Sequence, residues 1–183
     1  MAIGFMLSLE KSNIDVENKN ILILGAGGAG RTVAVKLAKT QKANKLVILN
    51  RTVEKANDIC NLIKNNSETE TICDGDDKLN EYAKSADILI NTTPLGMHLV
   101  NKDFENFDFL ENMGDAVVVD LIYNPKETRL LKKAKELGLK ALNGLDMLIF
   151  QALLSDEIYL KKKLDLDRLY AEVKRKLEDH IYG

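Results

Sequence analysis

An apolar run that passes directly into a glycine-rich turn constrains this 183-residue chain more than any other stretch. The run is Ile21–Leu24, and glycines follow at positions 25, 27 and 30. A run this short predicts a buried β-strand, and the helix-forming residues from Ala29 to Lys39 predict a helix after it. A strand, a G-x-G-x-x-G turn and a helix are typical of a dinucleotide site. The motif alone is equally compatible with a glycine-rich turn in another α/β protein.

Each glycine has its own expected role in such a site. Gly25 lets the chain turn sharply off the strand, Gly27 has no Cβ to keep a pyrophosphate away, and Gly30 lets the helix pack close to the sheet. The backbone N–H groups that open the helix would face the phosphates along a favourable dipole.

The end of the next apolar run distinguishes between the two common dinucleotides. An NAD site expects Asp or Glu about twenty residues after the last glycine, where it holds the ribose 2′-hydroxyl. Here Asn50 follows the run 45–49, and Arg51 and Thr52 come next, with Lys55 one turn on. A guanidinium can bind a 2′-phosphate with two hydrogen bonds, and Thr52 can add a hydroxyl or cap the following helix. The sequence therefore predicts NADP as the cofactor in preference to NAD.

Composition limits the remaining possibilities. The chain is 45% hydrophobic and 30% charged with a net charge of −2, which suits a single domain over residues 1–183 and argues against a nucleic-acid or anionic-membrane partner. No apolar stretch approaches the roughly 20 residues of a membrane span, and no signal peptide is evident. Cys60 and Cys73 lack metal-ligand spacing, so we expect buried or half-buried thiols in a reducing cytoplasm. We expect no metal.

The rest of the chain alternates between expected strands and helices. Six short strands separated by helices predict an α/β fold, a doubly wound parallel sheet of the Rossmann type with helices on both faces. This sheet core should occupy residues 20–143, between an initial helix in residues 1–11 and C-terminal helices in residues 144–183. The further strands are expected at 70–73, 88–90, 117–120 and 140–142, and the helices at 2–10, 29–40, 53–65, 79–84, 126–137 (ending at Gly138 as a C-cap), 145–161 and 166–180, with a loop carrying a short helical turn at 101–114.

Three further loops follow expected strands and should share the carboxyl edge of the sheet, where ligands bind in such folds. They are Asn91–Met97, rich in small hydroxyl and amide groups, Leu121–Pro125, and Asn143–Met147, which opens a helix that carries Gln151. Each could also be ordinary turn chemistry. Their shared position favours ligand binding.

Together with the glycine turn and Asn50–Thr52, these loops resemble shikimate dehydrogenase in order and spacing over roughly Ala2 to Leu160. The family reduces 3-dehydroshikimate to shikimate with NADPH. The resemblance implies a pyrophosphate cradle, an adenosine phosphate site, a cofactor trough, backbone contacts with nicotinamide, and substrate contacts. The pyrophosphate cradle would be Gly25, Ala26, Gly27, Gly28 and Ala29, and the adenosine phosphate site Asn50, Arg51, Thr52 and Lys55. Thr93 and Met97 would line the cofactor trough. Ile122 and Gly144 would contact the nicotinamide through their backbones, and Tyr123 and Gln151 would contact the substrate.

The chain also departs from the family pattern. Family members carry an N-terminal α/β domain that binds substrate and supplies a catalytic lysine and aspartate, and Met1 stands where that aspartate precedes an Ala-Ile-Gly-Phe segment. We therefore expect a truncated cofactor-binding domain with no catalytic residue of its own and little activity alone, since His98 is a lone loop histidine and His180 lies near the tail. Gly30 is a second departure, because the family usually has Ala or Ser there, and the smaller residue should be tolerated.

Other functions stay open at this point. A quinate/shikimate dehydrogenase of broader specificity, a glutamyl-tRNA reductase, and a non-catalytic nucleotide-sensing or interaction module share parts of the pattern. The motif from Gly144 to Gln151 argues against the tRNA enzyme. If a substrate domain is missing, its docking face on the first and last helices should expose apolar side chains and favour a homo-oligomer.

Overall fold

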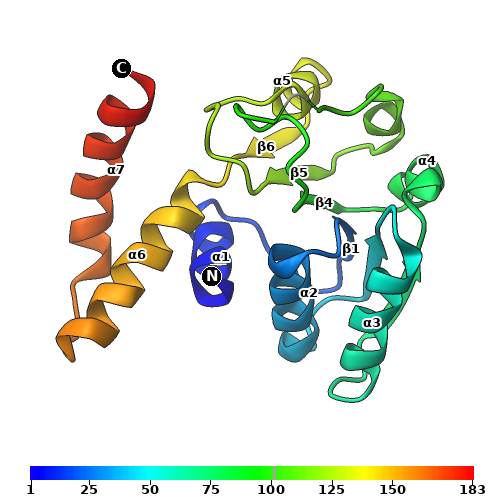
Figure 1. Cartoon of the computed structure of the whole chain (residues 1–183), viewed down its shortest axis with the longest axis horizontal. Coiled ribbons are helices and arrows are strands. Elements are labelled where there is room, and N and C mark those ends of the chain that lie inside the picture. The colour runs from blue at the N-terminus through cyan, green and yellow to red at the C-terminus, as the bar shows by residue number, and fades with distance from the viewer. Residues whose placement is uncertain (101) are drawn as a thin grey trace.

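A single parallel sheet organises the chain (Figure 1). The computed structural model describes residues 1–100 and 102–183, and the strands within them follow the order β3-β2-β1-β4-β5-β6 with every neighbouring pair parallel. This result confirms the predicted doubly wound sheet. The strands are β1 (Asn20–Leu24), β2 (Lys45–Leu49), β3 (Glu70–Asp74), β4 (Ile88–Asn91), β5 (Val117–Asp120) and β6 (Lys140–Leu142).

Helices cover both faces because the central strands are apolar on both sides. Ile21 and Ile23 of β1 pack into one core and Leu22 and Leu24 into another, as the twofold alternation of a strand requires. The first core lies under α1 (Ala2–Lys11), α2 (Gly28–Thr40) and α3 (Val53–Lys64), and the second under α4 (Leu79–Ala83), α5 (Arg129–Glu136) and the short 3-10 helix η2 (Asp108–Asn112); a further 3-10 turn, η1 (Asp76–Lys78), precedes α4.

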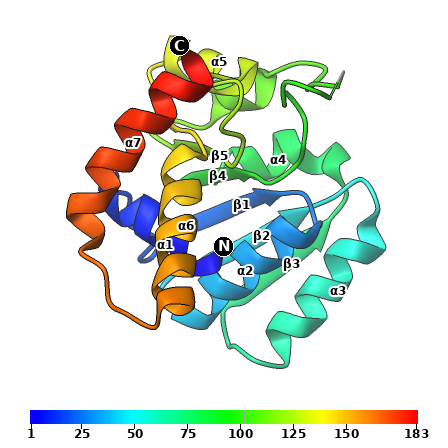
Figure 2. The same ribbon diagram turned by 60° about the vertical axis from the view of Figure 1, so that its left-hand side comes forward.

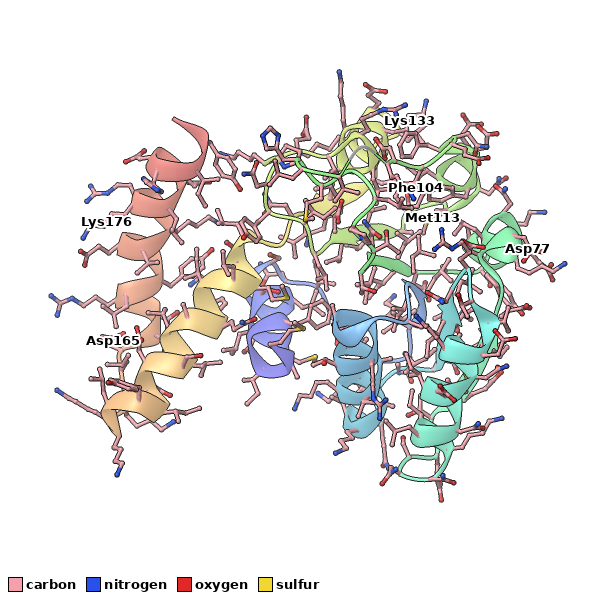
Figure 3. All side chains as sticks on the ribbon, in the orientation of Figure 1. Asp77, Phe104, Met113, Lys133, Asp165 and Lys176 are labelled. Carbon is pink, nitrogen blue, oxygen red and sulfur yellow. A yellow bond between two sulfur atoms is a disulfide. The ribbon has the colours of Figure 1, made fainter. Side chains whose placement is uncertain are left out.

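The last two helices stack outward from α1. α6 (Leu145–Leu160) packs on α1, and α7 (Leu166–Tyr182) lies against α6 (Figures 1 and 2). A Cβ on Gly4 would lie 2.9 Å from the main-chain nitrogen of Gln151, so α1 and α6 touch backbone to backbone. Asp165 is the N-cap of α7, and Lys176 lies on the side of α7 that faces away from α6 (Figure 3). Neither α6 nor any other helix in the described part of the chain is long and apolar enough to cross a membrane.

Most predicted boundaries are confirmed to within two residues, but the predicted start of α5 at Lys126 is wrong. The helix begins at Arg129, because Thr128 is its N-cap and accepts a hydrogen bond from the Leu131 N–H. Its end lies one residue before the predicted one: the helix ends at Glu136, Leu137 is the C-cap, and Gly138 follows with φ +80°. In the segment 101–114, the predicted helical turn is η2, and residue 101 lies outside the described residues.

The prediction of two separate thiols is also wrong, because Cys60 and Cys73 form a disulfide. Cys60 lies on the buried face of α3 and Cys73 on the adjacent β3, which brings their Cα atoms to 6.2 Å. Their thirteen-residue separation gave no sign of this pairing, because it depends on how α3 packs against the sheet edge. The expected burial is correct for Cys60, and Cys73 is half-buried.

Candidate functional site

The strand order reverses between β1 and β4, and this reversal marks where a ligand can bind. The chain leaves β1 toward β2 on one side, whereas β4 and β5 extend the sheet on the other. The loops that follow adjacent strands here diverge to opposite faces and leave a crevice beyond the carboxyl ends. The predicted cofactor-binding residues and Tyr123 lie in the segments that follow β1, β2, β4, β5 and β6 at this edge of the sheet.

The glycine turn after β1 has the close geometry predicted for it. Gly25 has φ +101°, a conformation that residues with a side chain rarely adopt. A Cβ on Gly30 would lie 2.0 Å from the Gly25 carbonyl oxygen and 2.8 Å from Oγ1 of Thr92. The Thr92 hydroxyl donates to the Leu24 carbonyl (2.7 Å), so the β4 loop also fixes this turn.

The outer side of the same turn is open. A Cβ on Gly27 or Gly28 would meet no atom within 4 Å among the described residues. No described side chain caps the start of α2, which begins at Gly28. The first N–H groups of a helix lack acceptors within the helix and lie at the positive end of its dipole, so this turn presents donors to an anion.

Asn50 joins the glycine turn to the loop after β2. Its Oδ1 accepts a hydrogen bond from the Ala26 N–H (3.0 Å), and its Nδ2 donates to the Thr52 carbonyl (2.8 Å). Arg51, Thr52 and Lys55 are exposed at this carboxyl end. Thr52 is the N-cap of α3 as predicted, but its hydroxyl makes no capping bond within the described part of the chain. The arrangement ties the loop that carries these residues to the glycine turn.

A buried polar cluster lies between β4 and β5. Asp120 and Asn91 are fully buried, and Nδ2 of Asn91 donates to Oδ1 of Asp120 (3.0 Å). The Thr128 hydroxyl donates to Oδ2 of Asp120 (2.7 Å), and the Ile122 N–H donates to Oδ1 (3.1 Å). Thr93 donates to Oδ1 of Asn91 from both its N–H and its hydroxyl. The cluster therefore fixes the loops that carry Thr93 and Ile122.

Burial controls the protonation of Asp120. Desolvation raises the pKa of its carboxyl to about 6, against the lowering effect of the hydrogen bonds from Thr128, Ile122 and Asn91. The nearby Asp103 carboxylate raises this pKa further.

The loops after β5 and β6 touch through their backbones. The Gly144 N–H donates to the Ile122 carbonyl (3.0 Å), and a Cβ on Gly144 would lie 2.0 Å from the Leu121 carbonyl oxygen. Ile122 is buried, whereas the side chains of Met97 and Tyr123 are each 39% exposed. Gln151 is half-buried on α6, beside Gly4. The structure thus joins Ile122 and Gly144 through their backbones, and it holds Gln151 on the separate layer formed by α1 and α6.

Sequence reasoning placed Asn91 and Thr92 in a candidate loop but assigned no supporting role to the side chains of Asn91, Thr92, Asp120 and Thr128. Asn91 and Asp120 are polar residues that end otherwise apolar strands, and this pattern could have marked them. Thr128 gave no such sign, because its role as both helix cap and Asp120 partner depends on the path of the loop.

A cavity of about 230 Å³ lies elsewhere, where β1 and β2 begin and α4 ends. The cavity is lined by the apolar residues Leu22, Val47 and Ile72 and also by Lys45 and Tyr82. This position is far along the strands from the loops described above, so we do not associate it with them.

The strand order and the glycine turn at its reversal define the protein as a Rossmann-type domain. The sequence pattern of the shikimate/quinate 5-dehydrogenase family matches residues 7–146, and the chain belongs to that family. The resemblance inferred from the loop motifs is confirmed.

Known relatives agree with this assignment. A shikimate dehydrogenase (NADP(+)) from Methanococcus aeolicus is 46% identical over 168 residues, which are 90% of this chain and 58% of that protein. A crystal structure of a shikimate dehydrogenase in complex with NADP+ is 38% identical, with a TM-score of 0.78 over 100% of this chain and 61% of its own. The chorismate mutase/shikimate 5-dehydrogenase fusion protein from Clostridium acetobutylicum is 34% identical, with a TM-score of 0.83 over 100% and 62%. The chain thus spans 58% of the curated Methanococcus relative.

Proposed function

We propose that this chain is the NADP(H)-binding domain of a shikimate dehydrogenase, an enzyme that reversibly reduces 3-dehydroshikimate to shikimate. The observation that carries the proposal is the Asn50 bridge, which places the Arg51 loop against the open glycine turn. One loop can then hold a pyrophosphate while the other holds a 2′-phosphate. The names of the Methanococcus relative and of the NADP+ complex support this choice of cofactor.

The bound cofactor would supply or accept the hydride, and the chain's own residues would hold and orient it. The N–H groups at Gly27, Gly28 and Ala29 would bind the pyrophosphate, while Arg51, Thr52 and Lys55 would bind the adenosine phosphate. The trough would be lined by Thr93 and Met97. Ile122 and Gly144 would meet the nicotinamide through their backbones, and Tyr123 and Gln151 would reach the substrate.

We propose that the chain alone turns substrate over slowly. Carbonyl reduction needs a proton donor within hydrogen-bond reach of the developing alkoxide. His98 and Tyr123 are exposed, and neither side chain is hydrogen-bonded to a base among the described residues. Shikimate-dependent reduction of NADP+ by the purified chain measures this property, and a rate typical of whole dehydrogenases would contradict it.

Replacement of Arg51 tests the cofactor assignment. Arg51→Ala should weaken NADP+ binding by roughly 10- to 100-fold, because a charge-assisted pair with the 2′-phosphate is lost, and should change NAD+ binding less than about twofold. Isothermal titration calorimetry with both nucleotides measures the two effects. Arg175→Ala is the matched control, since Arg175 is an exposed arginine on α7. Equal losses for both nucleotides would contradict the role of Arg51.

A further inference from the structure

The loop between β5 and α5, residues 121–128, carries Ile122 and Tyr123 and is held from one side by the start of α6. Besides the bond from Gly144 to Ile122, Nδ2 of Asn143 donates to the Lys126 carbonyl (2.8 Å). Oδ1 of Asn143 accepts from the Leu145 N–H (3.1 Å), so this side chain is fixed at both ends. These contacts join the loop after β5 to the segment that links β6 and α6.

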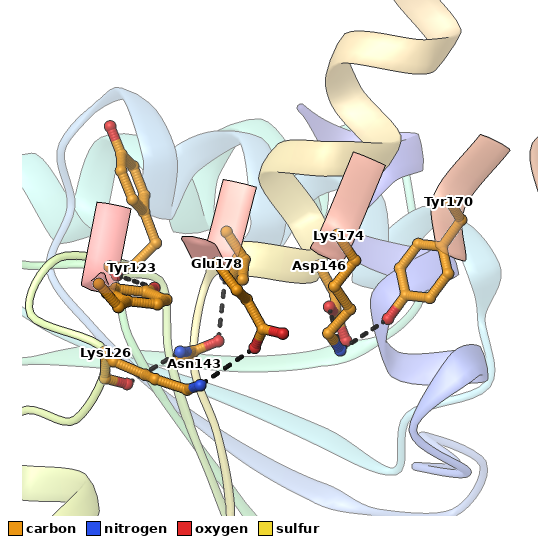
Figure 4. A network of polar contacts seen from close by, with 9 residues as sticks. Tyr123, Lys126, Asn143, Asp146, Tyr170, Lys174 and Glu178 are labelled. Atoms are coloured by element: carbon orange, nitrogen blue, oxygen red, sulfur yellow. Dashed lines mark hydrogen bonds and ion pairs between the residues drawn. The ribbon is translucent and has the colours of Figure 1, made fainter. Parts of the chain in front are cut away.

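The C-terminal end of α7 holds the same loop from another side (Figure 4). The Tyr182 hydroxyl donates to the Tyr123 carbonyl, and Oε1 of Glu178 lies 3.1 Å from Nζ of Lys126. The Lys126 ammonium also lies 5.2 Å from the centre of the Tyr182 ring. Burial raises the pKa of Tyr182, with Glu178 and Tyr123 adding to the rise. α7 therefore reaches the main chain directly after Ile122.

Contacts other than those of Tyr182 and Glu178 also hold α7 on the protein. Nearer the start of α7, Tyr170 stacks on Phe150 with ring centres 4.9 Å apart. Nζ of Lys174 lies 2.8 Å from Oδ1 of the buried Asp146 and donates to the Tyr170 hydroxyl (2.8 Å). These contacts and the apolar stripe of α7 hold the helix against α6. At the end of the helix, Glu178 and Tyr182 add contacts with the loop 121–128 to this packing.

We propose that the end of α7 positions the nicotinamide side of the site, with Tyr182 and Glu178 as positioning residues for the loop 121–128. This inference rests on the proposed function. Without the Tyr182 hydroxyl, the loop would also adopt conformations in which the hydrogen bond from the Gly144 N–H to the Ile122 carbonyl is broken. Only the remaining competent fraction would bind the nicotinamide ring, and the apparent affinity would fall by that fraction. Among the described residues, no hydrogen bond or ion pair joins α7 to the glycine turn or the Arg51 loop, so we expect the adenosine side to be unaffected.

Tyr182→Phe in the full chain tests the proposal with two probes, NADP+ and 2′-phospho-ADP-ribose, which lacks the nicotinamide ring. We expect the dissociation constant of NADP+ to rise by roughly 3- to 10-fold, the effect of one lost hydrogen bond, and that of the fragment to stay unchanged. Hydrogen–deuterium exchange of residues 121–126 should also become faster in the variant without ligand. Glu178→Gln should act in the same direction with a smaller effect, because its ion pair is partly exposed.

Tyr159→Phe is the matched control, because Tyr159 is 86% exposed on α6 and should change neither dissociation constant. Unaltered NADP+ binding and unaltered exchange in Tyr182→Phe would overturn the positioning role, as would an equal weakening of both probes. A wild-type chain that binds neither probe would instead defeat the proposed function, and the positioning role with it.

Discussion

At the scale of single residues, Asp120 connects the core to the site. It is a fully buried carboxylate at the end of β5 that accepts hydrogen bonds from Asn91 at the end of β4 and from Ile122 and Thr128 in the loop after β5. All three groups are donors, so the ionised form is well matched, although burial opposes the charge. The arrangement holds the loops after β4 and β5 in place, and burial raises the pKa of the Asp120 carboxyl that connects them.

We therefore predict that Asp120 makes unfolding pH-dependent. Its pKa in the folded protein is about 6, above the ordinary value of 3.8, so the folded state retains a proton that the unfolded chain releases. The stabilisation is present below about pH 4 and is lost as the pH rises through about 6. The expected loss is on the order of 3 kcal/mol, from two pKa units at about 1.4 kcal/mol each. The free energy of unfolding of the wild type, measured by denaturant titration relative to Asp120→Asn, should fall by that order between pH 4 and 7. A pH-independent difference between the two proteins would refute the assignment.

At the scale of elements, the unit β1–turn–α2 depends on one close approach. The Gly25 carbonyl that would meet a Cβ on Gly30 belongs to the backbone at the end of the central strand, so it cannot move without moving β1. The expectation that glycine is tolerated at position 30 is consistent with this packing. The approach is closer than a Cβ allows, so in this chain the glycine is required.

Gly30→Ala should accordingly destabilise the fold by more than about 1 kcal/mol and weaken NADP+ binding, because α2 must shift away from the sheet. Gly28→Ala is the matched control on the same helix. Its Cβ would enter open space among the described residues, and we expect a change in stability within about 0.5 kcal/mol. Thermal unfolding of both variants measures the difference. A Gly30→Ala variant as stable as Gly28→Ala would show that the turn relaxes freely.

The elements themselves were predictable because their signals are local. Apolar runs, glycine spacing and caps fixed all six strands and most helix limits, and strand ends located the candidate site. What could not be predicted depends on contacts between distant segments. The late start of α5 follows from the bond between Thr128 and Asp120, the disulfide from the packing of α3 on β3, and the bridge from Ala26 to Asn50 from the adjacency of two loops. Such pairings appear in a sequence only as isolated polar residues or cysteines.

At the scale of the whole molecule, apolar side chains are unevenly covered. The sheet is enclosed on both faces, but Ile158 and Tyr159 near the end of α6 are 79% and 86% exposed, and Ile3 at the start of α1 and Leu160 are also exposed. Single exposed apolar residues are common, whereas three in succession are not. α1 and α6 pack on each other (Figure 2), so these residues belong to the layer that the two helices form.

We predict that two copies of this chain associate through the layer formed by α1 and α6, because burial of these side chains would remove apolar surface from water. Sedimentation velocity should show a sedimentation coefficient that rises with protein concentration. Tyr159→Glu should abolish the rise, because association would bury a carboxylate without a partner. Leu137→Glu, a similar charge placed on a partly exposed leucine at the end of α5, should leave it intact. A single concentration-independent species for the wild type would contradict self-association. Loss of association in both variants would show that the added negative charge, and not the loss of apolar contacts of α6, prevents association.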